Sequence, residues 1–278
     1  VPFHYLIAPD GSIATANTIR DLMTDPDYDW GRVRAVKAGH IVYIPIEGRF
    51  TEKNIREVRY RPPLSDLPLI EASPEEAGRY IRERLVAETE KRLNFAKGRR
   101  IALAFSGGID SFSVGLAMRE LGILGDVEAF CINTEGLGKD WPNAQRAADY
   151  LGIGLNEIRA ARQHTVEAVP RAIWTSELYK DYDVFCAVAC YLLGEELAQR
   201  GIEAVFTGDG ANEAFRDYTS WGCYQTDRER MIQPGMGARL IEGRTEGDPY
   251  TSTQLGGGYA KSSARGSKVF GHFGVDGF

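Results

Sequence analysis

An apolar segment followed by two glycines constrains the fold of this chain more than any other feature. Residues 101–105 (IALAF) have the composition of a buried strand, and residues 106–111 (SGGIDS) follow them directly. The stretch from Phe112 to Leu121 then has the pattern of a helix. A glycine loop between a strand and the start of a helix presents backbone N–H groups to an anion. The segment therefore predicts a strand, a phosphate-binding loop and a helix in succession.

Downstream of this segment, strand and helix patterns alternate along the chain. Strands are predicted at residues 127–132, 154–158 and 204–206, and helices at residues 141–151, 165–175 and 184–200. Such alternation predicts right-handed βαβ crossovers and a mostly parallel sheet. Ligands of such sheets bind beyond the carboxyl ends of the strands. The glycine-bearing loops at 106–110 and 207–213 both leave strands at that edge, so we expect them to face one ligand.

The first part of the chain has a different pattern. Residues 1–60 contain short strand and turn signals and predict a small β-rich region. Residues 61–72 are rich in proline and are typical of a linker. Ser73, Pro74 and Glu76 form a capping-box sequence that predicts the start of a helix. We therefore expect a larger α/β domain at 73–278 behind the small region and its linker.

Composition limits the possible functions. The net charge of −6 argues against a general nucleic-acid-binding protein, which usually carries a basic surplus. No apolar run approaches the length of a membrane span, and no signal peptide is recognisable. None of the four cysteines belongs to a Cys-x-x-Cys pair, which favours reduced thiols. The sequence therefore predicts a cytoplasmic protein.

Three ordered motifs resemble those of a known family. Residues 106–111 resemble the Ser-Gly-Gly-x-Asp-Ser PP-loop of the ATP pyrophosphatases, and the lysine of the Walker loop is absent after the glycines. Residues 206–215 (FTGDGANEAF), with Tyr218 behind them, resemble the Ser-Gly-Glu-Gly-Ala-Asp-Glu segment of asparagine synthetases. Residues 263–276 resemble the Arg-x-x-Lys and Gly-Val-Glu motifs of that family. The chain thus resembles the asparagine synthetase and β-lactam synthetase family.

The resemblance implies a parallel-sheet PP-loop synthetase domain of the adenine nucleotide α-hydrolase-like type, preceded by a small β-rich remnant. It also implies a ligase that activates a carboxylate with ATP as an acyl-adenylate and releases AMP and pyrophosphate. Ammonia or an amine then attacks the adenylate to form an amide. ATP and Mg²⁺ are the cofactors that this chemistry implies.

The same resemblance implies roles for individual residues. The residues expected to bind the nucleotide are Ser106, Gly107, Gly108, Asp110, Ser111, Gly208 and Gly210. Asp110 is the expected magnesium ligand. The second metal position of the family falls at Asn212, a weaker neutral ligand, so either Glu213 or Asp209 compensates, or phosphates and water hold the metal.

Three further residues are expected to act in catalysis. Arg265 and Lys268 are expected to bind phosphate oxygens and to stabilise the leaving charge. Asp209 replaces a glutamate of the family motif. It either helps to deprotonate the amine or orients the substrate, or it is a turn residue between Gly208 and Gly210.

Departures from the family pattern narrow the substrate and the partners. Residues 183–193 correspond to part of the aspartate pocket and contain neither Arg nor Thr, so we expect a carboxylate other than aspartate. Glutamine-dependent members of the family begin with a catalytic cysteine, and no cysteine precedes Cys131 here. The glutaminase is therefore expected to be absent, vestigial (a degenerate remnant in residues 1–60) or encoded elsewhere. The C-terminal lysine of the family is missing, which predicts a fragment or half of a split enzyme. Expected partners are a small carboxylate, ammonia or an amine, a separate glutaminase, a complementary C-terminal chain or a second copy, and neither membrane nor nucleic acid.

Two alternative functions remain at this point. One is another PP-loop adenylating enzyme, similar to NAD synthetase or to tRNA-modifying enzymes. The absence of paired cysteines and of a basic patch argues against tRNA thiolation, and residues 207–213 favour the amide ligase. The other alternative is a non-catalytic half of a split synthetase, against which the intact 106–111 loop argues.

Overall fold

The computed structural model describes residues 3–23, 30–36, 40–45, 51–60, 71–134, 140–178, 181–211 and 264–278. The chain divides into two compact units. One comprises Val1–Pro68 with Asp217–Ala264, and the other comprises Leu69–Arg216 with Arg265–Phe278. The first glycine loop, the described part of the second loop and nearly all of the described C-terminal segment belong to the second unit, which therefore holds the candidate site.

The first unit is rich in short strands, as its sequence predicts. Strands β1 (His4–Ile7), β2 (Ile13–Ala16) and β3 (Arg34–Ala35) form an antiparallel sheet in the order β2-β1-β3. Helix α1 (Ile19–Leu22) follows β2, and β4 (His40–Tyr43) forms an antiparallel pair with β5 (Arg56–Arg59). Leu6 and Leu22 are fully buried in this unit.

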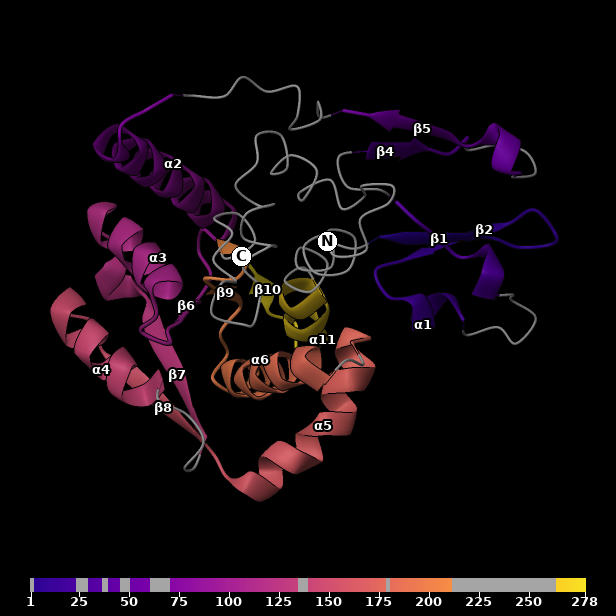
Figure 1. The fold of residues 1–278 in the computed structure, drawn as a ribbon. Coiled ribbons are helices and arrows are strands. Elements are labelled where there is room, and N and C mark those ends of the chain that lie inside the picture. Colours follow the sequence, from indigo (N-terminus) through magenta and orange to yellow (C-terminus); the bar gives the residue numbers. More distant parts are fainter. Residues whose placement is uncertain are drawn as a thin grey trace, which may run out of the picture. The chain divides into compact units, whose positions relative to one another are not determined.

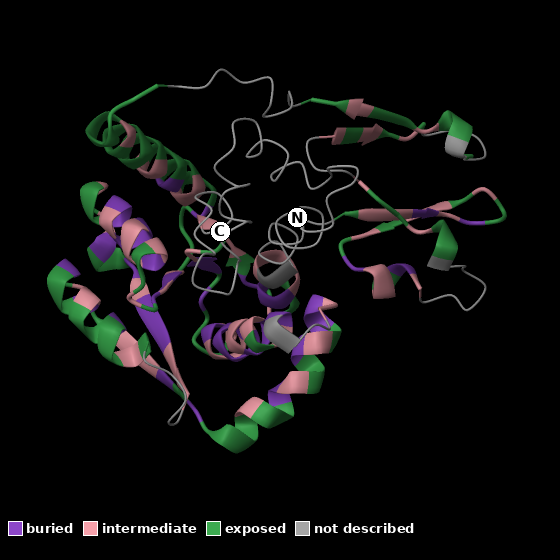
Figure 2. Ribbon diagram, in the orientation of Figure 1, coloured by how far each residue is buried: buried purple, intermediate pink, exposed green. Residues whose placement is uncertain are grey.

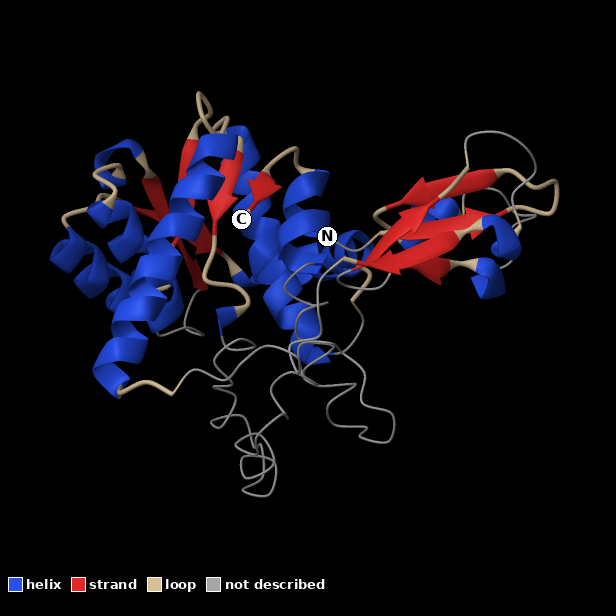
Figure 3. Ribbon diagram, turned by 90° about the horizontal axis from the view of Figure 1, so that it is seen from above, coloured by secondary structure: helices blue, strands red, loops and turns tan. Residues whose placement is uncertain are grey.

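The second unit is built on a parallel sheet with five strands in the described residues (Figures 1 and 3). The strands lie in the order β10 (Asp276–Gly277), β9 (Ala204–Phe206), β6 (Ile101–Ala104), β7 (Glu128–Thr134) and β8 (Leu155–Ala160). All four neighbouring pairs are parallel. The chain moves from β6 outward to β8 and then returns to place β9 on the other side of β6. This reversal is the point at which parallel sheets bind ligands.

Helices connect these strands. Helix α2 (Pro74–Phe95) precedes β6, α3 (Ile109–Glu120) joins β6 to β7, and α4 (Asp140–Leu151) joins β7 to β8. Helices α5 (Arg162–Ser176) and α6 (Asp181–Gln199) lie between β8 and β9. A π-helical turn (Ala264–Val269) and the short helix α11 (Phe270–His272) lead into β10. The strands and helices that the sequence predicts are all present, with boundaries that differ by a few residues.

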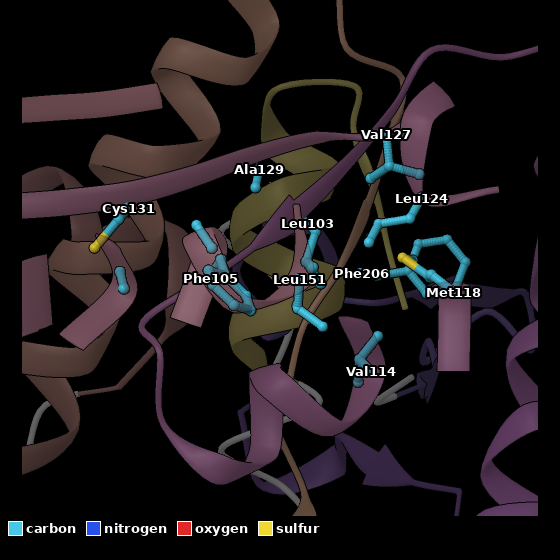
Figure 4. Packing of buried hydrophobic residues seen from close by; sticks show 12 residues of the cluster. Leu103, Phe105, Val114, Met118, Leu124, Val127, Ala129, Cys131, Leu151 and Phe206 are labelled. Atoms are coloured by element: carbon cyan, nitrogen blue, oxygen red, sulfur yellow. The ribbon is translucent and has the colours of Figure 1, made fainter. Parts of the chain in front are cut away.

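Alternating side chains bury both faces of the sheet. On one face, Leu103 packs with Val114, Met118 and Leu151 from α3 and α4 (Figure 4). On the other face, the buried strand residues Ala102, Phe130 and Val205 pack with Leu197 of α6 and Phe270 of α11. Figure 2 shows this concentration of buried residues along the strands. Two-sided burial explains the continuous apolar character of the strand sequences.

Helix α2 begins as its sequence predicts and remains largely exposed. The Glu76 backbone N–H donates to the Ser73 side chain, and the Ser73 N–H donates to the Glu76 carboxylate at 2.9 Å. Hydrogen bonding of its carboxylate to the Ser73 backbone N–H, and then to the Ser73 side chain, lowers the pKa of the Glu76 carboxyl group. Large apolar side chains of the helix are only partly covered, since Tyr80 is 47% exposed and Ile81 is 42% exposed.

Candidate active site

The loop between β6 and α3 is closed by its own serine side chains. The Gly108 N–H donates to Ser106 Oγ at 3.3 Å, and Ser111 Oγ donates to the Gly108 carbonyl at 3.2 Å. The two hydroxyl oxygens lie 3.3 Å apart. Gly108 is the N-cap of α3 and has no side chain with which to cap it. Helix α3 therefore begins without a side-chain cap, and its dipole favours an anion at this end.

Gly107 allows this loop to lie against the start of α4. Its φ angle is 73°, a conformation that favours glycine. A Cβ added at Gly107 would lie 2.5 Å from the backbone nitrogen of Ala144 and 2.5 Å from the carbonyl carbon of Asn143. The loop therefore requires glycine both for its backbone angle and for its close approach to α4.

The second glycine loop contacts the first directly. It follows β9, which is hydrogen-bonded to β6. A Cβ added at Gly208 would lie 2.7 Å from Asp110 Cβ and 2.7 Å from the Ser111 backbone nitrogen. The Asp209 N–H donates to Thr207 Oγ1 at 3.3 Å, and Gly210 has a φ of 94°. The structure thus brings the two loops side by side, as the sequence predicts.

A cavity of about 280 Å³ lies where the two loops meet. Its polar lining comes from Ser106, Asp110, Ser111, Asp140, Thr207, Gly208 and Asp209. Its apolar lining includes Phe130 and Ile132 of β7, Ala189, Cys190 and Leu193 of α6, and Phe270. The cavity therefore combines oxygen and N–H groups on one side with an apolar wall on the other, which is the usual composition of a small-molecule site.

Three carboxylates line this cavity, and sequence reasoning identified two of them. Asp110 opens α3, Asp209 is exposed in the second loop, and Asp140 begins α4 after β7. Asp140 belongs to no recognised motif, and its only signal in the sequence is its position just before a predicted helix. Among the described residues, no three His, Cys, Asp or Glu side chains form a ready-made metal cage.

The remaining predicted site residues lie elsewhere or outside the described part. Lys268 forms an ion pair with Glu177 at the end of α5, and its side chain is 7% exposed. Neither residue is among those that line the cavity of about 280 Å³. Arg265 lies in the π-helical turn Ala264–Val269. Asn212 and Glu213 lie outside the described residues.

Cys131 lies in the wall of the cavity and is 4% exposed. The pKa of its thiol is raised to about 12, mainly by burial and to a smaller extent by the negative charges of Asp140 and Glu157. Since the thiolate is the reactive form, this cysteine is inert at neutral pH. Cys131 forms no disulfide with any residue that the structure describes.

The fold and the cavity together define a class of protein: a parallel α/β domain with a phosphate-loop geometry at the reversal of its strand order. The family model of asparagine synthase matches residues 80–264, which is more than half of the chain. The chain therefore belongs to the asparagine synthase family. This is a family of ATP-utilising ligases of biosynthesis.

Curated relatives support this membership over part of their length. The chain is 27% identical over 121 residues to asparagine synthetase [glutamine-hydrolyzing] 3 of Arabidopsis thaliana, covering 41% of this chain and 21% of that protein. It is 26% identical over 140 residues to the asparagine synthetase [glutamine-hydrolyzing] of Gallus gallus, covering 49% and 25%. Amidase chry2 of Gibberella zeae is 29% identical over 186 residues, covering 57% and 27%. The chain thus spans only about a quarter of the length of these relatives.

Two solved structures match part of this chain with low similarity. The NH3-dependent NAD synthetase from Campylobacter jejuni matches with a TM-score of 0.40 and 17% identity, covering 68% of this chain and 95% of that one. The NMN synthetase from Francisella tularensis matches with a TM-score of 0.37 and 19% identity, covering 53% and 59%. Among the described residues, no helix is both long enough and apolar enough to cross a membrane.

Proposed function

We propose that this chain is the ATP-binding domain of an AMP-forming amide ligase that activates a carboxylate as an acyl-adenylate. The observation that carries the proposal is the contact between the two glycine loops, in which Gly208 lies against Asp110 and Ser111. This contact joins a phosphate-loop geometry to the loop whose sequence resembles that of amide-forming synthetases. Both loops line one cavity with an apolar wall.

In the first step, a carboxylate oxygen of the substrate attacks the α-phosphorus of ATP. The bond between that phosphorus and the oxygen leading to the β-phosphate breaks, and pyrophosphate leaves with the bonding electrons. Backbone N–H groups at the start of α3 and the hydroxyls of Ser106 and Ser111 donate hydrogen bonds to the departing phosphates. Phe130 and Ile132 offer the apolar surface that an adenine ring needs.

In the second step, ammonia or an amine attacks the carbonyl carbon of the acyl-adenylate. The bond between that carbon and the AMP oxygen breaks, and the nitrogen loses a proton. Asp209 lines the cavity and carries a carboxylate that can accept this proton. The Asp209 N–H also donates to Thr207 Oγ1, as in a turn. We propose that the Asp209 carboxylate serves either as the base or as the group that orients the amine.

The oxygen donors of the cavity suit Mg²⁺. Asp110, Asp140 and Asp209 contribute carboxylate oxygens, and Mg²⁺ is usually held by one or two carboxylates together with substrate phosphates. Asp110 is the residue proposed to hold it, because Asp110 is in the first turn of α3 beside the phosphate loop. Bound Mg²⁺ would neutralise phosphate charge during the transfer. Arg265 and Lys268 are proposed to add positive charge when substrates are bound.

The apolar wall restricts the carboxylate substrate. Ala189, Cys190 and Leu193 of α6 line the cavity, and the segment 183–193 contains neither Arg nor Thr. Such a wall does not compensate the second charge of a small diacid. We therefore propose a monocarboxylate with an apolar body rather than aspartate.

A product assay tests this function. The chain is incubated with ATP, Mg²⁺ and a panel of carboxylates, with ammonia or an amine present or absent. The proposal predicts AMP and pyrophosphate, with apolar monocarboxylates preferred over aspartate. Formation of ADP and phosphate, or equal turnover with no acid present, would contradict it.

A further inference from the structure

Glu177 ends α5 in a backbone conformation that residues with side chains seldom adopt. Its φ and ψ angles are 57° and 26°, and its N–H donates to the Ile173 carbonyl at 2.9 Å. It is the only residue other than glycine with a positive φ among those described. Glycine or asparagine is the usual residue at such a helix end, and a larger side chain destabilises it. The glutamate side chain therefore needs an explanation beyond capping the helix.

The side chain of Glu177 forms a largely buried ion pair. Its carboxylate accepts a hydrogen bond from the Lys268 ammonium group. The side chains of Glu177 and Lys268 are only 19% and 7% exposed. Removing either partner of such a shielded pair destabilises the fold around it, because the other charge is left poorly hydrated and unpaired.

Lys268 lies two residues before Phe270, which lines the cavity. Val269 and Phe270 are both fully buried. The segment 268–278 continues into β10, which pairs with β9.

The end of this segment also holds the second glycine loop. The Phe278 carbonyl accepts hydrogen bonds from the Thr207 N–H at 2.8 Å and from Thr207 Oγ1 at 3.3 Å. Thr207 Oγ1 in turn accepts the Asp209 N–H. Continuous contacts therefore run from Glu177 through residues 268–278 to the loop that carries Asp209.

We propose that Glu177 is a positioning residue for the adenylation site: it holds Lys268 and thereby fixes the segment 268–278, through which Phe270 and the second glycine loop are held at the nucleotide cavity. This inference rests on the proposed function, because the cavity is taken to bind ATP. Glu177 does not line the cavity and influences it through its ion pair with Lys268.

The kinetic test compares three variants with the unmodified chain. Glu177→Gln removes the charge, and Glu177→Gly removes the carboxylate while relieving the backbone conformation. Both are expected to raise KM for ATP by about tenfold, with a smaller change in kcat. The matched control is Glu195→Gln, which breaks the pair that His164 Nε2 forms with Glu195 at 3.1 Å between α5 and α6. This control is expected to leave KM unchanged.

Glu177→Gly also separates the proposal from a purely local role. If Glu177 merely ends α5, glycine at this position should raise the thermal midpoint and leave KM for ATP as it was. That result would overturn the proposal. The conservative variant Glu177→Asp keeps the negative charge beside Lys268 and should therefore retain more of the ATP affinity than Glu177→Gln. A KM for ATP equal to that of Glu177→Gln would argue against the pair.

Hydrogen exchange gives a readout that does not depend on activity. In the ligand-free protein, the amides of Thr207 and of residues 275–278 should exchange faster in Glu177→Gln and Glu177→Gly than in the unmodified chain and in Glu195→Gln. Unchanged exchange would overturn the positioning role even if the enzyme makes AMP. Faster exchange in a chain that makes no AMP with any acid would leave the positioning role intact and count against the proposed function alone.

Discussion

Gly208 and Asp110 lie so close together that a Cβ on Gly208 would sit 2.7 Å from Asp110 Cβ. The two residues are 98 positions apart in the chain, and they meet because β9 returns to pair with β6. Neither a side chain at position 208 nor a shift of Asp110 can be accommodated without moving the start of α3. The geometry of the phosphate loop therefore depends on a glycine in another loop.

Replacing Gly208 by alanine is expected to impair ATP-dependent turnover. The added methyl group would overlap Asp110 Cβ and the Ser111 backbone nitrogen, so the first turn of α3 must shift. We expect kcat/KM for ATP to fall by about tenfold or more, because small displacements of aligned groups are costly in catalysis. The control is Gly154→Ala, because no atom lies within 4 Å of a Cβ at that position. Equal activity of the two variants would contradict the contact.

Replacing Gly107 by alanine is expected to destabilise the fold more than replacing Gly152. Both glycines have a φ of 73°, so alanine costs each about 1 kcal/mol of backbone strain. Only at Gly107 does the new Cβ also overlap backbone atoms, those of Asn143 and Ala144; nothing lies within 4 Å at Gly152. Urea unfolding should therefore show a clearly larger loss of unfolding free energy for Gly107→Ala. Similar losses would mean that the loop does not lie against α4.

The buried thiol of Cys131 should make stability fall at high pH. Burial raises its pKa to about 12 in the folded protein, above the usual cysteine value. The stabilisation from keeping this thiol neutral is therefore complete below about pH 9 and is lost as the pH rises toward 12. We expect the difference in unfolding free energy between the unmodified chain and Cys131→Ala to narrow from pH 8 to pH 11. A constant difference across that range would show that the thiol is hydrated.

We expect pyrophosphate release to depend on Asp110 and not on Asp149, an exposed aspartate of α4. Asp110→Asn keeps the shape of the side chain and removes the charge proposed to hold Mg²⁺, so turnover should fall by about a hundredfold or more. Asp149→Asn changes an exposed residue of α4 and should have no effect. The comparison uses pyrophosphate release at saturating Mg²⁺. A rate of pyrophosphate release in Asp110→Asn equal to that of the unmodified chain would contradict the proposal that Asp110 holds Mg²⁺.

Local sequence signals predict much of the second unit. The run from Ile101 to Ser111 predicts β6, its loop and α3 because strand composition, glycines and a helix start follow one another without a gap. The capping box at Ser73 and Glu76 predicts the start of α2 for the same reason, since its bonds are local. The alternation of patterns predicts a parallel sheet, which the structure confirms.

Contacts between distant parts of the chain explain what sequence reasoning left open. The pairing of β10 with β9 spans about seventy residues and has no local signature. Asp140 lines the cavity because β7 ends beside β6, and no motif identifies it. The exposure of Tyr80 and Ile81 on α2 is set by what packs against the helix and not by its local sequence. Likewise, the partner of Lys268 follows from the packing of α5 and not from the motif around the lysine.

Transfer of a labelled oxygen atom from the carboxylate to AMP is the most direct test of acyl-adenylate formation. The chain is given ATP, Mg²⁺, an amine or ammonia, and an active carboxylate labelled with ¹⁸O in both oxygens. Attack of the carboxylate on the α-phosphorus predicts that AMP acquires one ¹⁸O atom and that the amide keeps the other. AMP without ¹⁸O, or ADP and phosphate as the products, would contradict acyl-adenylate formation at this site.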